Sequence, residues 1–340
     1  MQKKWIGYLG GMLCACQIFW GNGNVAAAEV APPNLQTIIV DNMKTKEYDG
    51  YIWRIDAKDT STLPRTFRTS NSDFKENKGK YGLDSTYIPT REGLDTLYAS
   101  GSAQFSKNQF PILVKTLKEQ AKGPIYIVDL RQENHGFFNN DAVSWYGKRD
   151  WGNIGKTHKE VVNLEPKLLA KAKDTNTERA TLDDNKNADA KDTSYISSVE
   201  TEKSLVESAD LHYVRITATD HIWPSPENID DFIKLYRKLP KDAWLHFHCE
   251  AGKGRTTTYL AMYDMMKNPQ VSLKDILYRQ LLLGGNYVAY TGEGSNSWKV
   301  PFYQQKADMI KVFYQYVQEN HQSNYKVLWS KWLEQYNQNK

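Results

Sequence analysis

The chain has 340 residues, a length that allows one large domain or a main domain carrying a smaller one. Lys and Arg number 44 against 40 Asp and Glu, whereas a nucleic-acid-binding protein carries a pronounced basic excess. This balance excludes nucleic acid as the expected partner, so any polyanionic ligand must be met by a local cluster of cations.

The first residues have the pattern of an export signal. Lys3 and Lys4 precede an apolar stretch over 5–20, and residues 26–28 offer an A-x-A cleavage site. We expect a signal peptide over 1–28 and a protein that is secreted, periplasmic or on the cell surface. A lipoprotein box at 13–16 is the alternative, which would leave Cys16 lipidated. The apolar run is too short and too broken for a transmembrane anchor, and we expect no membrane span elsewhere.

Removal of the signal leaves Cys249 as the only cysteine of the mature chain, so we expect no internal disulfide. The lone thiol is either a buried small side chain, which is common, or a reactive group. Composition alone leaves both interpretations open.

Apolar runs flanked by turn signals predict strands over 125–130, 213–217 and 243–248. A helix is predicted from Pro226, with Ser225 as its N-cap, to just before Pro240. Further helices are predicted over 256–267, 272–283 and 301–320, and from Ser330. This alternation indicates an α/β fold whose helical second half packs on one side of a sheet.

A polar stretch over about 141–201 interrupts this pattern. It is rich in Lys, Asp, Asn and Thr, and we interpret it as a small inserted domain in which Asp183–Thr193 is an exposed loop. A disordered linker is the alternative. The predicted division is 29–140 for the N-terminal part of the core, 141–206 for the insertion and 207–340 for the rest of the core.

The segment from Trp244 to Leu260 carries the chemistry. A strand runs into Cys249, a loop with two glycines follows, and a helix begins at about Arg255. Backbone N–H groups and a helix N-terminus suit a phosphate dianion and favour a thiolate, the effective nucleophile. Arg255 can hold two phosphate oxygens with its planar fork, and the hydroxyl of Thr256 can support the thiolate as a leaving group. For His248 we favour a core role that shapes the loop.

A leaving alkoxide needs a proton from a carboxylic acid that faces the cysteine. Asp220 follows the strand at 213–217 and lies where open α/β sheets place ligands. Asp230 and Asp231 fall within the next helix, where solvated charges are expected, so Asp220 is the candidate acid, with a turn-forming role as its alternative. His221 could bind phosphate or tune Asp220.

The string H-C-x-x-G-x-x-R-T resembles the signature of the protein tyrosine phosphatase superfamily. Together with Asp129–Glu133, His135–Gly136, Ser144–Gly147 and Thr219–His221, it resembles the protein-tyrosine-phosphatase-like phytases of anaerobic gut bacteria. The resemblance covers most of the chain from about Gly50 to Trp332. It implies an α/β phosphatase core with a small inserted β-barrel, and stepwise removal of phosphates from myo-inositol hexakisphosphate without metal or other cofactor.

Residue by residue, the resemblance implies Cys249 as nucleophile, Asp220 as general acid, Arg255 as phosphate ligand and Thr256 as helper of the leaving thiolate. It implies contacts to phosphates from the loop and from scattered polar side chains. The loop residues are Glu250, Ala251, Gly252, Lys253 and Gly254, and the others are Arg54, Asp150, Lys186, His221, Lys299, Tyr303 and Lys306. Lys186 is assigned weakly because its segment departs from the family pattern, and Lys253 is a charge that many relatives lack.

Three rivals stay open. A tyrosine or phosphoinositide phosphatase would use the same chemistry, and a catalytically dead module would bind phosphate only. A metal hydrolase is a third class, but the seven histidines show no H-E-x-x-H or similar spacing. We expect a monomer that binds inositol hexakisphosphate and lower inositol phosphates.

Overall fold

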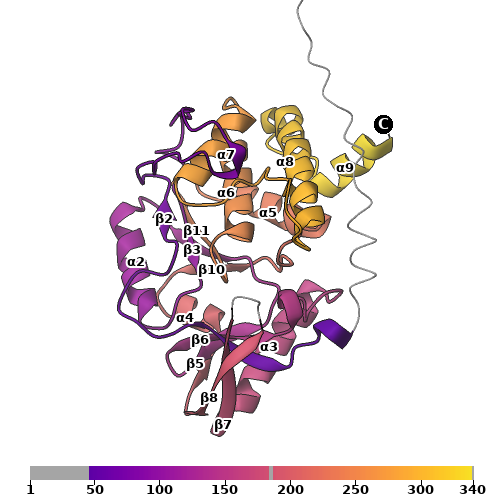
Figure 1. The fold of residues 1–340 in the computed structure, drawn as a ribbon. Coiled ribbons are helices and arrows are strands. Elements are labelled where there is room, and N and C mark those ends of the chain that lie inside the picture. The colour runs from indigo at the N-terminus through magenta and orange to yellow at the C-terminus, as the bar shows by residue number, and fades with distance from the viewer. Residues whose placement is uncertain (1–45, 184–186, 339–340) are drawn as a thin grey trace, which may run out of the picture. The chain divides into compact units, whose positions relative to one another are not determined.

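The computed structural model describes residues 46–183 and 187–338. The predicted signal peptide and Lys186 lie outside these ranges. Within them, two sheets carry the fold, and Figure 1 shows the helices α5 to α9 gathered over the first sheet while the second sheet lies at the opposite end. Among the described helices, none combines the length and the apolar character needed to cross a bilayer.

The first sheet holds the strands predicted from the apolar runs. Its order is β10 (His212–Arg215), β4 (Ile125–Asp129), β11 (Trp244–Cys249), β3 (Ala99–Ala103) and β2 (Arg68–Thr69). All neighbours run parallel except β2 and β3. Strands β4 and β11 are buried on both faces, which explains their nearly continuous apolar sequences.

Strand β3 consists of small residues and was not predicted, because its sequence has no apolar pattern. A Cβ added to Gly101 would lie 2.7 Å from Cγ2 of Thr256 in helix α6. The close approach of α6 to the sheet therefore requires glycine here, and it seats the start of α6 directly over β3.

Helices cover both faces of the first sheet. One face carries the larger core, to which α5 (Pro226–Lys238), α6 (Gly254–Lys267), α7 (Leu273–Leu282), α8 (Val300–Asn320) and α9 (Trp329–Gln338) contribute. The other face is packed by α2 (Gln109–Gln120) and α4 (Glu202–Glu207). Pro226 is the first residue of α5, and the Ser225 hydroxyl accepts a hydrogen bond from the Asn228 amide, as predicted for this cap.

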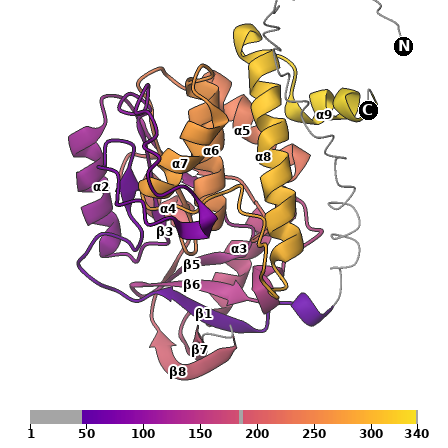
Figure 2. The ribbon, with the colours of Figure 1, turned by 45° about the horizontal axis from the view of Figure 1, so that its top comes forward.

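The second sheet has the order β8 (Ala188–Ile196), β7 (Thr175–Leu182), β1 (Ile52–Ala57), β6 (Asp141–Tyr146), β5 (His135–Phe138) and β9 (Val199–Glu200). Helix α3 (His158–Ala172) packs against it, and Figure 2 shows β1, β5 and β6 crossing below the helical half. Strand β1 comes from the N-terminal segment rather than from 141–206. None of the pairings among the described residues joins β8 to β9 to close a barrel.

The expectation of a loop over Asp183–Thr193 is wrong for its second part. Residues from Ala188 onward form β8, which pairs antiparallel with β7 from Leu182↔Ala188 to Thr175↔Ile196. Most of the described side chains of β8 are exposed, so the strand is mostly polar and shows no apolar pattern. Its place in the sheet is set by the hydrogen bonds to β7.

The remaining described elements are short helical turns: η1 (Lys46–Tyr48), η2 (Lys80–Gly82), η3 (Lys148–Asp150) and η4 (His321–Ser323). Turn η3 follows β6 of the second sheet. It carries Asp150, and the indole N–H of the next residue, Trp151, donates to the carbonyl oxygen of Asp220 over 3.0 Å. The second sheet thereby supports the loop that follows β10 of the first sheet.

Candidate active site

Cys249 ends β11, and the loop 250–253 leads directly into α6. The cysteine is buried, with 2 % of its surface exposed. The hydroxyl of Thr256 donates to its Sγ over 3.2 Å. A donor at this distance supports a thiolate both before attack and as a leaving group.

The carbonyl groups of the loop are held by groups outside it. The Glu250 carbonyl accepts from the Gln104 amide, and the Ala251 carbonyl accepts from the Thr66 hydroxyl over 3.1 Å. The carbonyl of Gly252 accepts from Nη1 of Arg68 over 2.8 Å. Within the described part of the chain, the amides of 251–253 donate to no protein group. A run of unpaired N–H groups before a helix N-terminus is a site for a phosphate.

Gly252 makes the shape of this loop possible. Its φ is +68°, and a Cβ there would lie 2.3 Å from the carbonyl carbon of Ser102 and 2.4 Å from the amide nitrogen of Ala103. Any other residue would clash with the backbone of β3.

Arg255 lies across the loop from the cysteine and is held by two carboxylates. Its Nη1 and Nη2 contact Oε2 and Oε1 of Glu133 at 2.6 and 2.8 Å. Its Nε lies 3.1 Å from Oδ1 of Asp220. Glu133 thus fixes one edge of the guanidinium, while Asp220 occupies the edge that a phosphate can take.

Asp220 and His221 form the loop after β10. Oδ2 of Asp220 lies 3.2 Å from Nε2 of His221. Burial favours the neutral form of Asp220, but the charges of Arg255 and His221 bring its pKa below the usual value. Burial lowers the pKa of His221 to about 4, and Lys299, Lys306 and Arg255 act in the same direction. A phosphate bound to Arg255 would raise the pKa of Asp220, because added negative charge disfavours the ionised form of a carboxylic acid.

Arg54 and Asp150 face the loop from the second sheet. Nη1 of Arg54 contacts Oδ2 of Asp150 at 2.9 Å, and its Nε contacts Asp56 at 2.5 Å. Burial raises the pKa of Asp150 to about 7, since Arg54 is shared with Asp56 and the charge of Glu133 repels a further carboxylate. Asp150 therefore gains or loses a proton near neutral pH, unlike Asp220 and His221.

Lys299, Tyr303 and Lys306 stand at the start of α8, beside the acid loop. The indole of Trp298 packs edge-on against His221 with ring centroids 5.0 Å apart, and Nζ of Lys306 lies 5.2 Å from the Tyr303 ring centroid. Burial and the charge of Lys299 lower the pKa of Lys306 to about 8, against the attraction of Asp220. These groups place positive charge next to the acid.

The structure thus brings most of the predicted site residues around one loop. Glu250 takes part through its backbone, since its side chain pairs with Arg65 at 3.1 Å, and Lys186 lies outside the described residues. Two residues that contact the site, Glu133 on Arg255 and Arg68 on Gly252, were not among the predicted site residues. The signal for Glu133 was present, because a carboxylate four residues beyond the buried Asp129 lies at the carboxyl end of β4.

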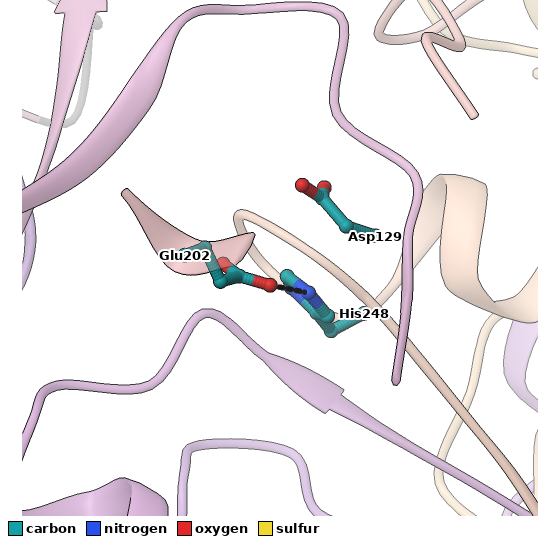
Figure 3. A group of neighbouring side chains, drawn as sticks. All are labelled: Asp129, Glu202 and His248. Carbon is teal, nitrogen blue, oxygen red and sulfur yellow. Dashed lines mark hydrogen bonds and ion pairs between the residues drawn. The ribbon is translucent and has the colours of Figure 1, made fainter. Parts of the chain in front are cut away.

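One buried group could be mistaken for a metal site. Ligand atoms of Asp129, Glu202 and His248 lie within 4.8 Å of one another, and Figure 3 shows the His248 ring pointing at the Glu202 carboxylate, with which Nε2 is paired at 2.6 Å. However, Nε2 of His135 lies 3.1 Å from Asp129 and 3.3 Å from Glu202, and Arg215 lies 2.9 Å from Asp129. These cations already balance the carboxylates, so the cluster is explained by ion pairs. The ring of His248 bonds a carboxylate rather than the loop backbone.

Comparisons with known proteins agree with this geometry. A family model for PTP-like phytases, described as "Inositol hexakisphosphate", matches residues 128–267. The effector protein hopD2 of Pseudomonas syringae pv. tomato is 28 % identical over 249 residues, which are 71 % of this chain and 52 % of that protein.

Among solved structures, the PTP-like myo-inositol phosphatase from Mitsuokella multacida, in complex with myo-inositol-(1,3,4,5)-tetrakisphosphate, is 54 % identical with a TM-score of 0.81. The match covers 87 % of this chain and 52 % of that chain, so the chain spans about half the length of these relatives. A PTP-like phytase from Bdellovibrio bacteriovorus is 31 % identical with a TM-score of 0.66, and the match covers 85 % of this chain and 96 % of that one. The resemblance in the sequence is confirmed: this chain belongs to the PTP-like phytase family.

Proposed function

We propose that this protein is a phytase that removes phosphates stepwise from myo-inositol hexakisphosphate through a phosphocysteine intermediate. The observation that carries the proposal is the loop after Cys249: the carbonyls of 250–252 accept hydrogen bonds from outside the loop, and the amides of 251–253 have no partner among the described residues. A phosphate seated there has its phosphorus next to the nucleophile and its oxygens on N–H groups and Arg255.

In the first step the Cys249 thiolate attacks phosphorus, and Asp220 donates its proton to the leaving inositol oxygen. The S–P bond forms as the P–O bond breaks. Arg255 holds the equatorial oxygens, and to do so its Nε exchanges Asp220 for phosphate. This exchange frees Asp220 and raises its pKa at the moment when it must carry a proton.

In the second step a water attacks the phosphocysteine and Asp220, now ionised, accepts its proton. The leaving group is the thiolate, which the hydroxyl of Thr256 stabilises from 3.2 Å. No step needs a metal, and we expect EDTA to leave turnover unchanged. Loss of turnover on chelation, restored by added metal, would count against the thiolate mechanism.

The choice of an inositol polyphosphate rests on the cations around the loop and on the relatives. Lys299 and Lys306 place positive charge beside the acid loop in addition to Arg255, which is more than one phosphate requires. The Mitsuokella relative was solved with an inositol tetrakisphosphate. Lys253, inside the loop, is the one observation that favours a phosphoinositide phosphatase as a second candidate.

Purified protein assayed on phytate, a phosphotyrosine peptide and a phosphoinositide separates these candidates. We expect phytate to have the highest kcat/KM, and turnover of phytate no better than that of the peptide contradicts the substrate assignment. Cys249→Ser should abolish turnover of all three substrates. A Cys249→Ser variant with full activity contradicts the mechanism, and an inactive wild-type protein that still binds phytate supports a binding module.

We also propose that the protein is exported by cleavage after Ala28. The support is the basic, apolar and small-residue pattern of 1–28, which lies outside the described residues. Mass spectrometry of the mature protein should find Glu29 at its N-terminus. A lipidated N-terminal Cys16 would replace this proposal with a membrane-anchored form.

A further inference from the structure

A second group of cations, distinct from Lys299 and Lys306, is centred on Lys253 of the catalytic loop. It consists of Lys75, Lys80 and Lys253. Nζ of Lys253 donates to the carbonyl of Gly284 over 2.6 Å, and Nζ of Lys75 lies 2.9 Å from the point where a Gly284 Cβ would stand. Gly284 thus brings Lys75 and Lys253 together at the rim of the loop.

The charges of these lysines act on one another. The pKa of Lys253 is lowered by burial and then by the positive charges of Arg68, Lys75 and Lys80. The cations that act on His221 are different ones, namely Lys299, Lys306 and Arg255. Two distinct groups of positive charge therefore act on the site, one on Lys253 of the loop and one on His221 of the acid loop.

Lys75 and Lys80 are exposed, and this second group lacks the carboxylate partners that the buried arginines of the site have. Arg54 and Arg255 each contact two carboxylates. In contrast, no carboxylate of the described residues lies within 4 Å of Nζ of Lys75, Lys80 or Lys253. Gathering like charges without a counter-charge costs free energy, unless an anion binds there.

A small cleft beside the catalytic loop is lined by Lys306 at one end and by Tyr81, the residue after Lys80, at the other. It has a volume of about 70 Å³, and it is lined by Gly254 and Thr258 at the start of α6 and by tyrosines. Nζ of Lys80 lies 4.7 Å from the Tyr81 ring centroid, the Tyr81 ring lies 4.8 Å from that of Tyr290, and the Tyr290 ring lies 5.2 Å from that of Tyr303. Lys306 stands at the far end of this row, over Tyr303. The cleft has room for about two water volumes, enough for one phosphate group and too little for an inositol ring.

We propose that Lys75, Lys80 and Lys253 bind a second phosphate of the inositol ring whose reacting phosphate occupies the Cys249 loop. This inference rests on the proposed function and names how the same site selects its substrate. Two groups of cations would then bind phosphates of the same ring: Lys299 and Lys306 beside the acid, and the group of Lys75, Lys80 and Lys253. A substrate with a single phosphate has no second phosphate to bind to Lys75, Lys80 and Lys253.

The test compares the double variant Lys75→Ala/Lys80→Ala with the wild type on phytate and on p-nitrophenyl phosphate. A lysine that contacts a phosphate contributes roughly tenfold to affinity. We therefore expect the ratio of kcat/KM for phytate to kcat/KM for p-nitrophenyl phosphate to fall by about 30-fold or more. Lys115→Ala/Lys118→Ala removes two exposed charges from α2 and should leave the ratio unchanged. Lys80→Glu should lower the ratio further than Lys80→Ala.

Phosphates on a lipid headgroup offer the same chemistry as phosphates on a free inositol ring. Vesicles that contain a phosphoinositide bisphosphate or a monophosphate give the second arm of the test. A loss confined to phytate identifies the soluble ring as the ligand, and a loss confined to the bisphosphate vesicles identifies the headgroup; both support the site. An unchanged ratio on both multiply phosphorylated substrates overturns it. If the wild type cleaves p-nitrophenyl phosphate but neither inositol substrate, the proposed function itself fails.

Discussion

Two networks of buried acidic and basic side chains meet near the carboxyl end of β4, and they differ in how exposed their last members are. The first network runs through Arg54, Asp56, Arg131, Glu133, Arg255 and Asp220. The second network joins His248, Glu202, His135, Asp129, Arg215 and Glu165. With Asp150 on Arg54, the first contains four acids and three arginines, whereas the second contains three acids and three bases, and both are almost wholly buried.

The difference lies in the last member of each network. The side chain of Asp220 is 19 % exposed and ends the first network at the catalytic loop, whereas the carboxylate side chains of the second network are at most 7 % exposed. A ligand can replace Asp220 on Arg255, but it cannot reach Asp129 or Glu202. A buried ion pair is weak evidence for function by itself. The first network reaches the catalytic loop through Arg255 and Asp220, so we assign it to function and the second network to structure.

The largest expected effect comes from exchanging one carboxylate in each network. Glu133→Gln leaves Arg255 without its bidentate partner, and we expect kcat on phytate to fall by about 100-fold or more. Glu202→Gln is the matched change in the second network, and it should lower the free energy of unfolding while kcat falls by less than about threefold. Steady-state kinetics and thermal unfolding on both variants make the comparison. Equal losses of kcat would mean that the two networks do not differ in function.

The next effect concerns the exposed end of the first network. Asp220→Asn removes the proton donor, and kcat on phytate should fall by about 100-fold. The loss should be smaller on p-nitrophenyl phosphate, whose leaving group needs less help from an acid. Asp231→Asn is the control, because Asp231 pairs with Lys234 at 3.0 Å on the exposed face of α5. If kcat fell in the Asp231 variant and not in the Asp220 variant, the general acid would be Asp231 in α5 rather than Asp220.

A smaller effect, on stability rather than catalysis, tests the second network. Burial opposes a charge on His135, yet Asp129 and Glu165 raise its pKa to about 9. Its contribution to stability is therefore complete below pH 6.5, the pKa of an unfolded histidine, and is lost as pH rises through 9. At pH 6 the protonated ring contributes on the order of 3 kcal/mol.

His135→Gln should therefore lower the unfolding free energy more at pH 6 than at pH 9.5. Urea unfolding of both proteins at the two pH values measures the difference. The same loss at both pH values would show that the ring is neutral in the folded protein.

The sequence predicted the catalytic centre better than its surroundings. Cys249, Arg255 and Thr256 lie in one continuous string whose spacing fixes their geometry, and the helix Pro226–Lys238 was marked by its cap and its proline. The partners of Arg255 could not be read in the same way. Glu133 meets it only because β4 pairs with β11, and this register is a tertiary contact between positions about 120 residues apart.

The strands of the second sheet were the hardest part of the fold to predict from the sequence. Strand β8 has a polar sequence, and β1 joins the sheet from a distant part of the chain, so neither carries a local signal for its place. Local patterns report burial and turns, and these strands are set by hydrogen bonds to their neighbours. The same reasoning explains why the lysine group was not predicted, since Lys75 and Lys253 meet at Gly284, which is distant from Lys75 in the sequence.

The smallest effect concerns Lys306, whose charge acts on Asp220 at the exposed end of the first network and depends on pH. Burial and Lys299 lower the pKa of Lys306 to about 8, so the lysine is charged below this pH and loses its charge above it. We expect KM for phytate to rise by about threefold between pH 7 and pH 9, because a neutral amine binds phosphate less well. In Lys306→Arg the guanidinium stays charged over this range, and the rise should disappear. KM for p-nitrophenyl phosphate, measured in parallel, corrects for titration of the catalytic groups themselves. An alkaline rise of the same size in wild type and Lys306→Arg would assign it to another group, of which Asp150, whose pKa is about 7, is the nearest alternative.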